Sequence, residues 1–295
     1  MKTILVPTDF SDYALFALKA AASIARKIKA KIVLAHVYNL PSDGMDMHYY
    51  IDQYYQDIKK QAVVELNKFA AMDFLKRIKV EKLVLTDMLM WQIVTLERFK
   101  GIDLIVIGSH GKSGFNKIFI GSNTEKIVRL ADSPVLTIKN ELEDFSIDRM
   151  VFASNFYEEA YAAFEKIKFF ADIYHSHIDL LKVITPKNFE PSAQSVKLIH
   201  DFISKFKLND CSINIYNSFN IEQGIIDFSI EKNSDLIAIE THGRTGFAHL
   251  INGSLTEDLL KQESKPILSI KMQQHSEYAH ELLKYSNGYN NWGSE

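Results

Sequence analysis

The chain contains the same sequence pattern twice. The stretch at 103–139, DLIVIGSHGKSGFNKIFIGSNTEKIVRLADSPVLTIK, returns at 235–271 as DLIAIETHGRTGFAHLINGSLTEDLLKQESKPILSIK. The shared glycines have a common offset of 132, as 243 minus 111 and 253 minus 121 both show. A chain of 295 residues also exceeds the usual size of one hydrophobic core. The repeat therefore predicts two tandem copies of one domain.

The beginnings of the two copies match as well. KTILVPTDFSDYALFALKAAASIA at 2–25 resembles DRMVFASNFYEEAYAAFEKIKFFA at 148–171, with an offset of 146. The two offsets differ by 14, so the first copy carries about that much extra chain between its first helix and its glycine loop. We expect the extra chain at 39–55, NLPSDGMDMHYYIDQYY. For its tyrosines at 49, 50, 54 and 55, packing within the chain is favoured over anchoring of a partner.

The copies are separated by the short acidic stretch NELEDFS at 140–146. We therefore predict a first domain at 1–140 and a second at 147–272. The last residues, 273–295, are polar and end in Gly and Asn, and we treat them as a C-terminal appendage.

Strand and helix patterns alternate within each copy. In the first copy, apolar and β-branched runs predict strands at 3–7, 31–37, 80–85, 103–107 and 134–139, and helices occupy the gaps. Ser11 is the expected N-cap of the first helix. The predicted fold class is α/β, with two tandem open parallel five-stranded sheets covered by helices on both faces.

Composition limits the partners. The formal net charge of -3 gives no electrostatic reason to expect nucleic acid, and no run of about 18 apolar residues suggests a membrane span. The single cysteine, Cys211, rules out an intrachain disulfide framework, which suits a reducing compartment. We expect a cytoplasmic protein that binds neither nucleic acid nor membranes.

The glycine loop at 108–122 leaves a predicted strand and enters a predicted helix. Gly108 and Gly111 would let the backbone approach phosphates without a Cβ in the way. Two other phosphate motifs fail: Val106 stands where a P-loop needs its first glycine, and His110 stands at the second glycine of GxGxxG. The loop is therefore a phosphate cradle of another kind, or only a connection.

The helix after this loop begins at Ser122, Asn123 and Thr124. Unpaired N–H groups and the positive end of the helix dipole favour an anion there. The competing interpretation is that Ser122 and Glu125 simply form a capping box. The glycine spacing and the recurrence of the whole unit favour the phosphate interpretation.

Three motifs together resemble the universal stress protein family: VPTD at 6–9, HV at 36–37 and G-x2-G-x9-GS at 108–122. The resemblance covers nearly the whole chain as two copies. It implies strand order 3-2-1-4-5, an adenine nucleotide alpha-hydrolase-like fold and ATP across the carboxyl ends of strands one and four, where such sheets bind ligands. It also implies that Asp9 contacts adenine and that Val37 packs against the base.

The first copy thus supplies a set of candidate ATP-binding residues. They are Pro7, Thr8, Asp9, Val37, Gly108, Ser109, His110, Gly111, Lys112, Ser113, Gly121, Ser122, Asn123 and Thr124. The expected cofactor is ATP, and any Mg²⁺ would be held mostly by phosphates and water. We find no catalytic residues and no metal-ligand cluster, so we do not expect an enzyme, although weak ATP hydrolysis stays open.

The second copy departs from the motif. Glu240 stands where Gly108 stands in the first copy, and Ala153 and Asn155 replace Pro7 and Asp9. A carboxylate close to phosphates is unfavourable, by about 1 kcal/mol at 4 Å in water and about 4 at an effective dielectric of 20. We therefore expect one ATP per chain.

Two functions follow as alternatives. The first is a regulatory, stress-response ATP-binding protein that acts on a protein partner the sequence does not identify. The second is an interaction module with the same fold and no nucleotide. In either case the strand segments PVLTIK at 134–139 and KPILSIK at 265–271 should pair edge to edge. The chain would then be an intrachain pseudo-dimer, which leaves association into a homodimer open.

Overall fold

The computed structural model describes residues 1–38, 48–86, 96–97, 100–110, 121–142, 144–241, 259 and 263–272, without the side chains of 48–55, 86 and 122. The strands of the first copy are β1 (Thr3–Pro7), β2 (Lys31–Tyr38), β3 (Val80–Thr86), β4 (Leu104–Gly108) and β5 (Val135–Ile138). Its helices are α1 (Asp12–Ile28), α2 (His48–Ala70), the 3₁₀ turn η1 (Asp73–Leu75) and α4 (Ser122–Leu130).

The second copy repeats this order. Its strands are β6 (Arg149–Ala153), β7 (His177–Ile184), β8 (Cys211–Asn217), β9 (Leu236–Thr241) and β10 (Ile267–Lys271). Its helices are η2 (Glu158–Ala160), α5 (Tyr161–Tyr174), α6 (Ser192–Phe206) and α7 (Ile221–Glu231).

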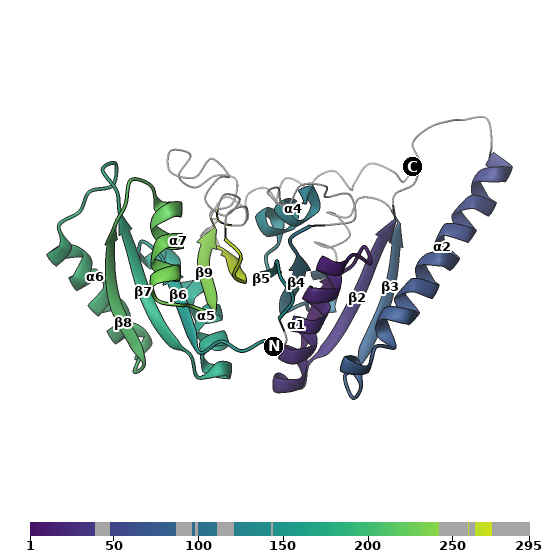
Figure 1. The fold of residues 1–295 in the computed structure, drawn as a ribbon, viewed down its shortest axis with the longest axis horizontal. Helices are drawn as coiled ribbons and strands as arrows, with labels where there is room; N and C mark the ends of the chain where they lie inside the picture. The colour runs from purple at the N-terminus through teal and green to yellow at the C-terminus, as the bar shows by residue number, and fades with distance from the viewer. Residues whose placement is uncertain are drawn as a thin grey trace, which may run out of the picture.

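The strands form one continuous sheet in the order β3-β2-β1-β4-β5-β10-β9-β6-β7-β8. Each half is parallel and has the order 3-2-1-4-5, as predicted. The prediction of two sheets needs one refinement, because the halves share hydrogen bonds and make a single ten-stranded sheet. Figure 1 shows the two halves side by side, with β5 near the middle.

The two halves meet through their last strands. β5 pairs with β10 antiparallel, and Leu136 lies opposite Leu268. These two residues are 132 apart, so each is the counterpart of the other, and an approximate two-fold axis passes between them. The predicted edge-to-edge pairing is therefore confirmed, and it leaves neither terminal strand as a free edge.

Strand register confirms the alignment of the copies and locates the extra chain. In the first copy Ile32 pairs with Val80, and in the second Ile178 pairs with Cys211. The offset between the copies is thus 146 at β2 and β7 (178 minus 32) and 131 at β3 and β8 (211 minus 80). All the extra residues of the first copy therefore lie between β2 and β3. The 23-residue α2 is accordingly longer than the 15-residue α6. Residues 39–47, the tyrosine side chains and the tail at 273–295 lie outside the described residues.

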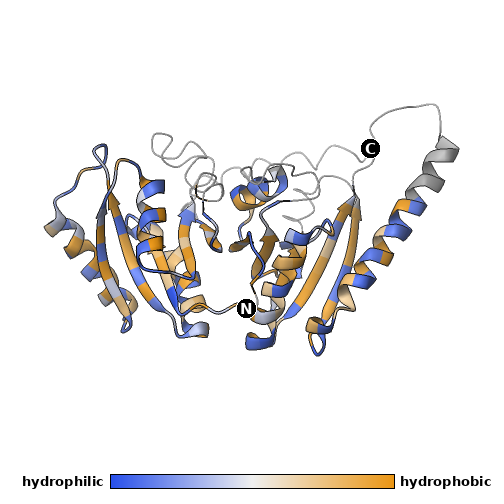
Figure 2. Ribbon diagram, in the orientation of Figure 1, coloured by the Kyte–Doolittle hydropathy of each residue, from blue (hydrophilic) through white to orange (hydrophobic). Residues whose placement is uncertain are grey.

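Apolar residues fill both faces of the sheet. Helices α1, α2, α5 and α6 pack on one face, and α4 and α7 pack on the other. Figure 2 shows the pattern behind this arrangement, since the strands are largely hydrophobic and the helices carry hydrophilic residues on the side away from the sheet. The expected N-cap is confirmed, because the Ser11 hydroxyl accepts a hydrogen bond from the Ala14 amide at 3.2 Å.

The second copy has a core of packed aromatic rings. Phe202 on α6 is fully buried, and its ring centroid lies 4.6 Å from that of Phe164 and 4.7 Å from that of Phe206. Phe152 and Phe156 complete the group around it. This cluster fixes the end of β6 against α5 and α6.

Candidate functional site

The candidate nucleotide site lies at the carboxyl ends of β1, β2 and β4. Pro7 ends β1, Gly108 ends β4, and Val37 lies one residue before the end of β2. Parallel strands end at the same edge of the sheet, and between β1 and β4 the connections run in opposite directions. The fold therefore brings these three predicted residues to one edge, where α4 also begins (Figure 1).

A tight turn follows β1 and leads into α1. The Thr8 amide donates to the Ala35 carbonyl at 2.8 Å, and the Thr8 hydroxyl accepts from the Phe10 amide at 3.0 Å. Asp9 Oδ1 accepts from the Ser11 amide at 3.1 Å. Phe10 itself has a φ of 63°, in the left-handed region. Asp9 is thus half-buried at the sheet edge, and one of its oxygens helps to shape the turn.

The structure shows why position 108 is a glycine, and the reason is a contact that the sequence did not indicate. A Cβ at this position would lie 2.6 Å from both the carbonyl carbon and the oxygen of Tyr13 in α1. The glycine is therefore needed for close packing of α1 on β4. In the described residues this packing, rather than an approach to phosphate, accounts for Gly108.

Helix α4 begins at Ser122, as predicted, and Gly121 is its N-cap, which has no side chain that could accept a hydrogen bond. The competing interpretation, a capping box of Ser122 and Glu125, placed the N-cap at Ser122, whose side chain lies outside the described ones. Two other bonds hold the helix start. The Gly121 amide donates to the Ser109 carbonyl at 2.9 Å, and the Thr124 hydroxyl donates to the Gly108 carbonyl at 2.8 Å. Because Gly121 has no side chain to cap the first turn, backbone N–H groups at this helix start suit an anionic ligand.

Two histidines lie beside the site. His110 is buried, its Nδ1 is 2.8 Å from the Ser109 hydroxyl, and its ring centroid is 4.9 Å from that of Tyr13. His36 Nδ1 lies 2.7 Å from the Thr8 carbonyl oxygen, which fixes the proton on that nitrogen because a carbonyl only accepts. In the sequence analysis, His36 enters only as the first residue of the HV motif at 36–37. Its place next to Val37, at the end of a strand, was the signal for a supporting role.

Among the described residues, the fold brings part of the candidate ATP-binding set together. Thr8, Asp9, Ser109, His110 and the first turn of α4 meet at one edge, with Asn123 exposed. Gly111, Lys112 and Ser113 lie outside the described residues. Within the described ranges, no three His, Cys, Asp or Glu side chains lie close enough together to hold a metal ion.

The second copy builds the same turn with different chemistry. The Ser154 hydroxyl accepts from the Phe156 amide and Asn155 Oδ1 accepts from the Tyr157 amide, both at 2.9 Å. The amide of Asn155 therefore serves the turn as well as the carboxylate of Asp9 does. The helix that follows begins with a 3₁₀ turn instead of an α-turn.

The main difference is Glu240. Its side chain is 7% exposed, and its Oε1 accepts from the Ser154 hydroxyl at 2.7 Å. Burial raises the pKa of this carboxyl to about 7, although the Ser154 hydroxyl and the nearby Asn155 backbone act in the opposite direction. The second copy thus has a carboxyl group at this position of the sheet edge, where the first copy has Gly108 and no side chain.

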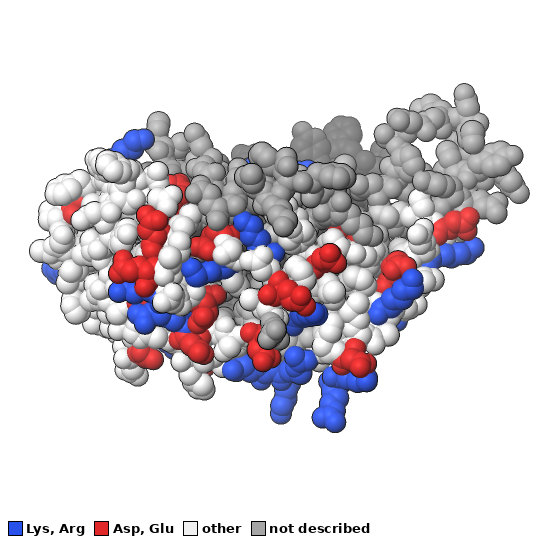
Figure 3. Space-filling model, viewed as in Figure 1, with Lys and Arg blue, Asp and Glu red and all other residues white. Residues whose placement is uncertain are grey.

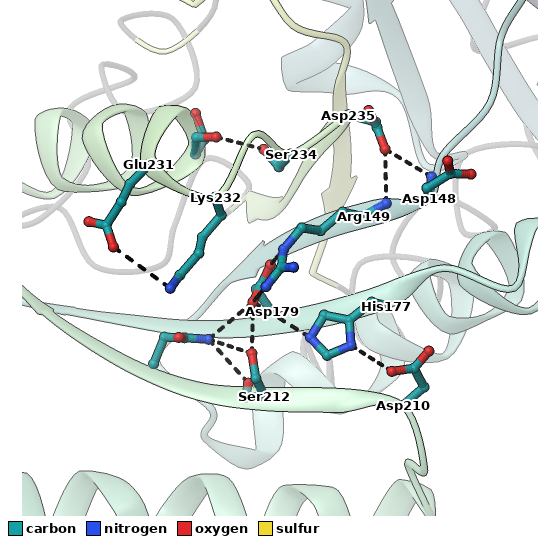
Figure 4. Close-up of polar contacts among 12 residues, drawn as sticks. Asp148, Arg149, His177, Asp179, Asp210, Ser212, Glu231, Lys232, Ser234 and Asp235 are labelled. Atoms are coloured by element: carbon teal, nitrogen blue, oxygen red, sulfur yellow. Dashed lines mark hydrogen bonds and ion pairs between the residues drawn. The ribbon is translucent and has the colours of Figure 1, made fainter.

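Another polar cluster lies at the opposite end of the sheet (Figure 4). Asp179 is fully buried and accepts from Arg149 Nε at 2.6 Å, from Arg149 Nη2 at 2.8 Å and from the Ser212 hydroxyl at 2.7 Å. Burial alone would raise the pKa of Asp179, but these bonds and the Arg149 charge lower it. The cluster joins β6, β7 and β8, and we assign it to stability rather than to ligand binding.

Surface charges are mixed. On the face in Figure 3, acidic and basic side chains alternate over the described residues and form no continuous basic patch. Among the residues that the structure describes, no helix combines the length and the apolar character that spanning a bilayer requires.

Comparison with known proteins gives one consistent result. A model described as the universal stress protein family matches residues 1–139. The chain is 31% identical over 139 residues to the universal stress protein MJ0531 of Methanocaldococcus jannaschii, which covers 47% of this chain and 82% of the relative. It is 24% identical to the universal stress protein Slr1230 of Synechocystis over 92% of this chain and 100% of that protein. The crystal structure of a universal stress protein from Archaeoglobus fulgidus has the same fold, with a TM-score of 0.71, 22% identity and coverage of 93% of this chain and 97% of that one.

Proposed function

The chain belongs to the universal stress protein family, and from this premise we propose that it is a regulatory ATP-binding protein with one working site, in its first copy. The observation that carries the proposal is the start of α4. Its N-cap, Gly121, has no capping side chain, and its first turn is fastened to the end of β4 by the Thr124 hydroxyl. Phosphates would bind these N–H groups, which point along the helix axis towards the sheet edge.

For the other end of the nucleotide, the family resemblance supports a position at Asp9 and Val37. Asp9 and Val37 lie at the ends of β1 and β2, on the side of the edge away from β5. Adenine would lie against Val37 and donate a hydrogen bond to Asp9, so that the nucleotide spans the edge from β2 to α4. A Mg²⁺ ion, if bound, would take most of its ligands from phosphates and water.

A signalling role in the cytoplasm, through a protein partner, completes the proposal. At this edge the described residues place one hydroxyl beside a base, Ser109 next to His110, but Ser109 is fully buried, which supports regulation over catalysis. The second candidate function is an interaction module without nucleotide. Glu240 supports it, because in the second copy this residue places a carboxyl group where the first copy would bind phosphate.

Asp9→Asn tests the adenine contact. We expect the affinity for ATP to fall about fivefold, because a hydrogen bond to a neutral acceptor is weaker than one to a carboxylate by about 1 kcal/mol. The fold should be unchanged, since Asn155 makes the matching turn bond at 2.9 Å with an amide. Isothermal titration calorimetry on nucleotide-free protein gives the affinity, and thermal unfolding gives the stability.

The matched control is Asn155→Asp, the reverse change at the equivalent position of the second copy. It should leave ATP affinity within twofold of the wild type. Equal affinities for wild type and Asp9→Asn, or an equal loss in both variants, would remove Asp9 from the site.

A further inference from the structure

A cavity of about 500 Å³ opens at the carboxyl ends of β6, β7 and β9. Its volume is within the range of small-molecule sites. Leu181, Val183, Ile225 and Ile239 give it apolar walls, and Tyr157 adds an aromatic ring. Because β6 and β9 are the counterparts of β1 and β4, the cavity occupies in the second copy the edge at which we place ATP in the first.

Glu240 lines this cavity with an unused acceptor. The side chain is more than nine-tenths buried, and Oε1 already accepts from Ser154. Among the described residues, Oε2 has no hydrogen-bond partner. A buried carboxylate oxygen without a donor is unfavourable, and a ligand that brings an N–H group would satisfy it.

The remaining charges of the cavity favour a positive ligand. The Lys182 ammonium pairs with Glu190, which also accepts from the Ser195 hydroxyl at 2.9 Å. This pair is neutral as a unit, so ionised Glu240 leaves the described part of the lining with one negative charge. Glu159 adds to the negative potential at Glu240. The Tyr157 ring already faces a cation, with the Lys182 nitrogen 5.3 Å from its centroid.

We propose that this cavity binds an organic amine without phosphate groups. The apolar body of the ligand packs on the walls formed by β7, β9 and α7, and its ammonium group donates to Glu240 Oε2. A nucleoside phosphate is disfavoured, because its phosphates would meet the carboxyl group that replaces Gly108 of the first copy. The duplicated chain thus has two sites of opposite preference, and the second does not depend on ATP binding to the first.

The test uses phenethylamine and tryptamine as probes, with phenethyl alcohol and 3-phenylpropionate as uncharged and anionic controls. Titration of the full chain is followed by ligand-detected NMR. We expect saturable binding of both amines, at least tenfold weaker binding of the alcohol and no binding of the carboxylate. Glu240→Gln, which keeps size and an acceptor for Ser154, should weaken amine binding at least tenfold, while Asp9→Asn should change it less than twofold.

The pH dependence provides a second readout on the wild-type chain. The amine binds ionised Glu240, whose pKa is about 7, so its affinity should fall as the pH is lowered through 7 and level off above it. The amine stays charged in this window, as a lysine with a pKa of about 10 does. In the part of the chain that the structure describes, the other titratable groups that line the cavity or act on Glu240 are Tyr157, Lys182, Glu190 and Glu159. No saturable amine binding, equal binding of amine and alcohol, or full affinity in Glu240→Gln overturns the proposal.

Discussion

ATP affinity is expected to fall by about 5- to 1,000-fold when Asn123 is replaced by Asp. Asn123 is exposed in the first turn of α4, where we place the phosphates. A new carboxylate about 4 Å from a phosphate costs about 1 kcal/mol in water and about 4 at a partly buried edge. The helix itself should gain about 0.3–1 kcal/mol, because a negative side chain is favourable at a helix N-terminus. Calorimetric titration should therefore show lost affinity in a chain that is as stable as the wild type or more so.

The control for charge is Arg129→Gln. Arg129 lies in the last turn of the same helix, is exposed, and its replacement shifts the net charge by the same one unit. ATP affinity should stay within twofold of the wild type. If Asn123→Asp binds ATP as the wild type does, phosphates do not lie at the start of α4.

Phe202→Ala should reduce the free energy of unfolding by about 3–5 kcal/mol. The ring is fully buried and contacts Phe152, Phe156, Phe164 and Phe206, so its removal leaves a cavity between β6 and α6. A loss of this size is a large part of the roughly 5–15 kcal/mol that stabilises a typical protein. Urea unfolding followed by circular dichroism measures it.

Phe219→Ala is the matched control, because Phe219 is 92% exposed. Its unfolding midpoint should equal that of the wild type. A midpoint for Phe202→Ala that also equals the wild type would show that the aromatic cluster does not hold the second half of the sheet together.

Much of the fold could be predicted from the sequence because its signals are local and occur twice. Apolar runs predicted each strand of the first copy to within a residue or two, and the offset of 132 anticipated that Leu136 and Leu268 are counterparts. The antiparallel pairing followed from a physical requirement, since a terminal strand with an open edge needs a partner.

The details of the site were harder to predict because they depend on tertiary contacts. The requirement for Gly108 comes from Tyr13, about 95 positions away in the chain, and no local pattern reports that contact. Gly121 is the N-cap, rather than the Ser122 of the capping-box alternative, and the Thr124 hydroxyl and the Ser109 carbonyl fix where α4 begins. Similarly, the substitution at 240 was visible in the sequence, but the cavity beside it needs the packing of β7, β9 and α7.

The stoichiometry of ATP binding tests the central claim most directly. Nucleotide-free wild-type protein is titrated with ATP in the presence of Mg²⁺ by calorimetry, and the same titration is repeated with Asn123→Asp. We expect one equivalent of ATP per chain for the wild type and an affinity at least about fivefold lower for the variant. Two equivalents per chain, or wild-type affinity in Asn123→Asp, would contradict a single site in the first copy, and no binding to the wild type would favour the interaction module.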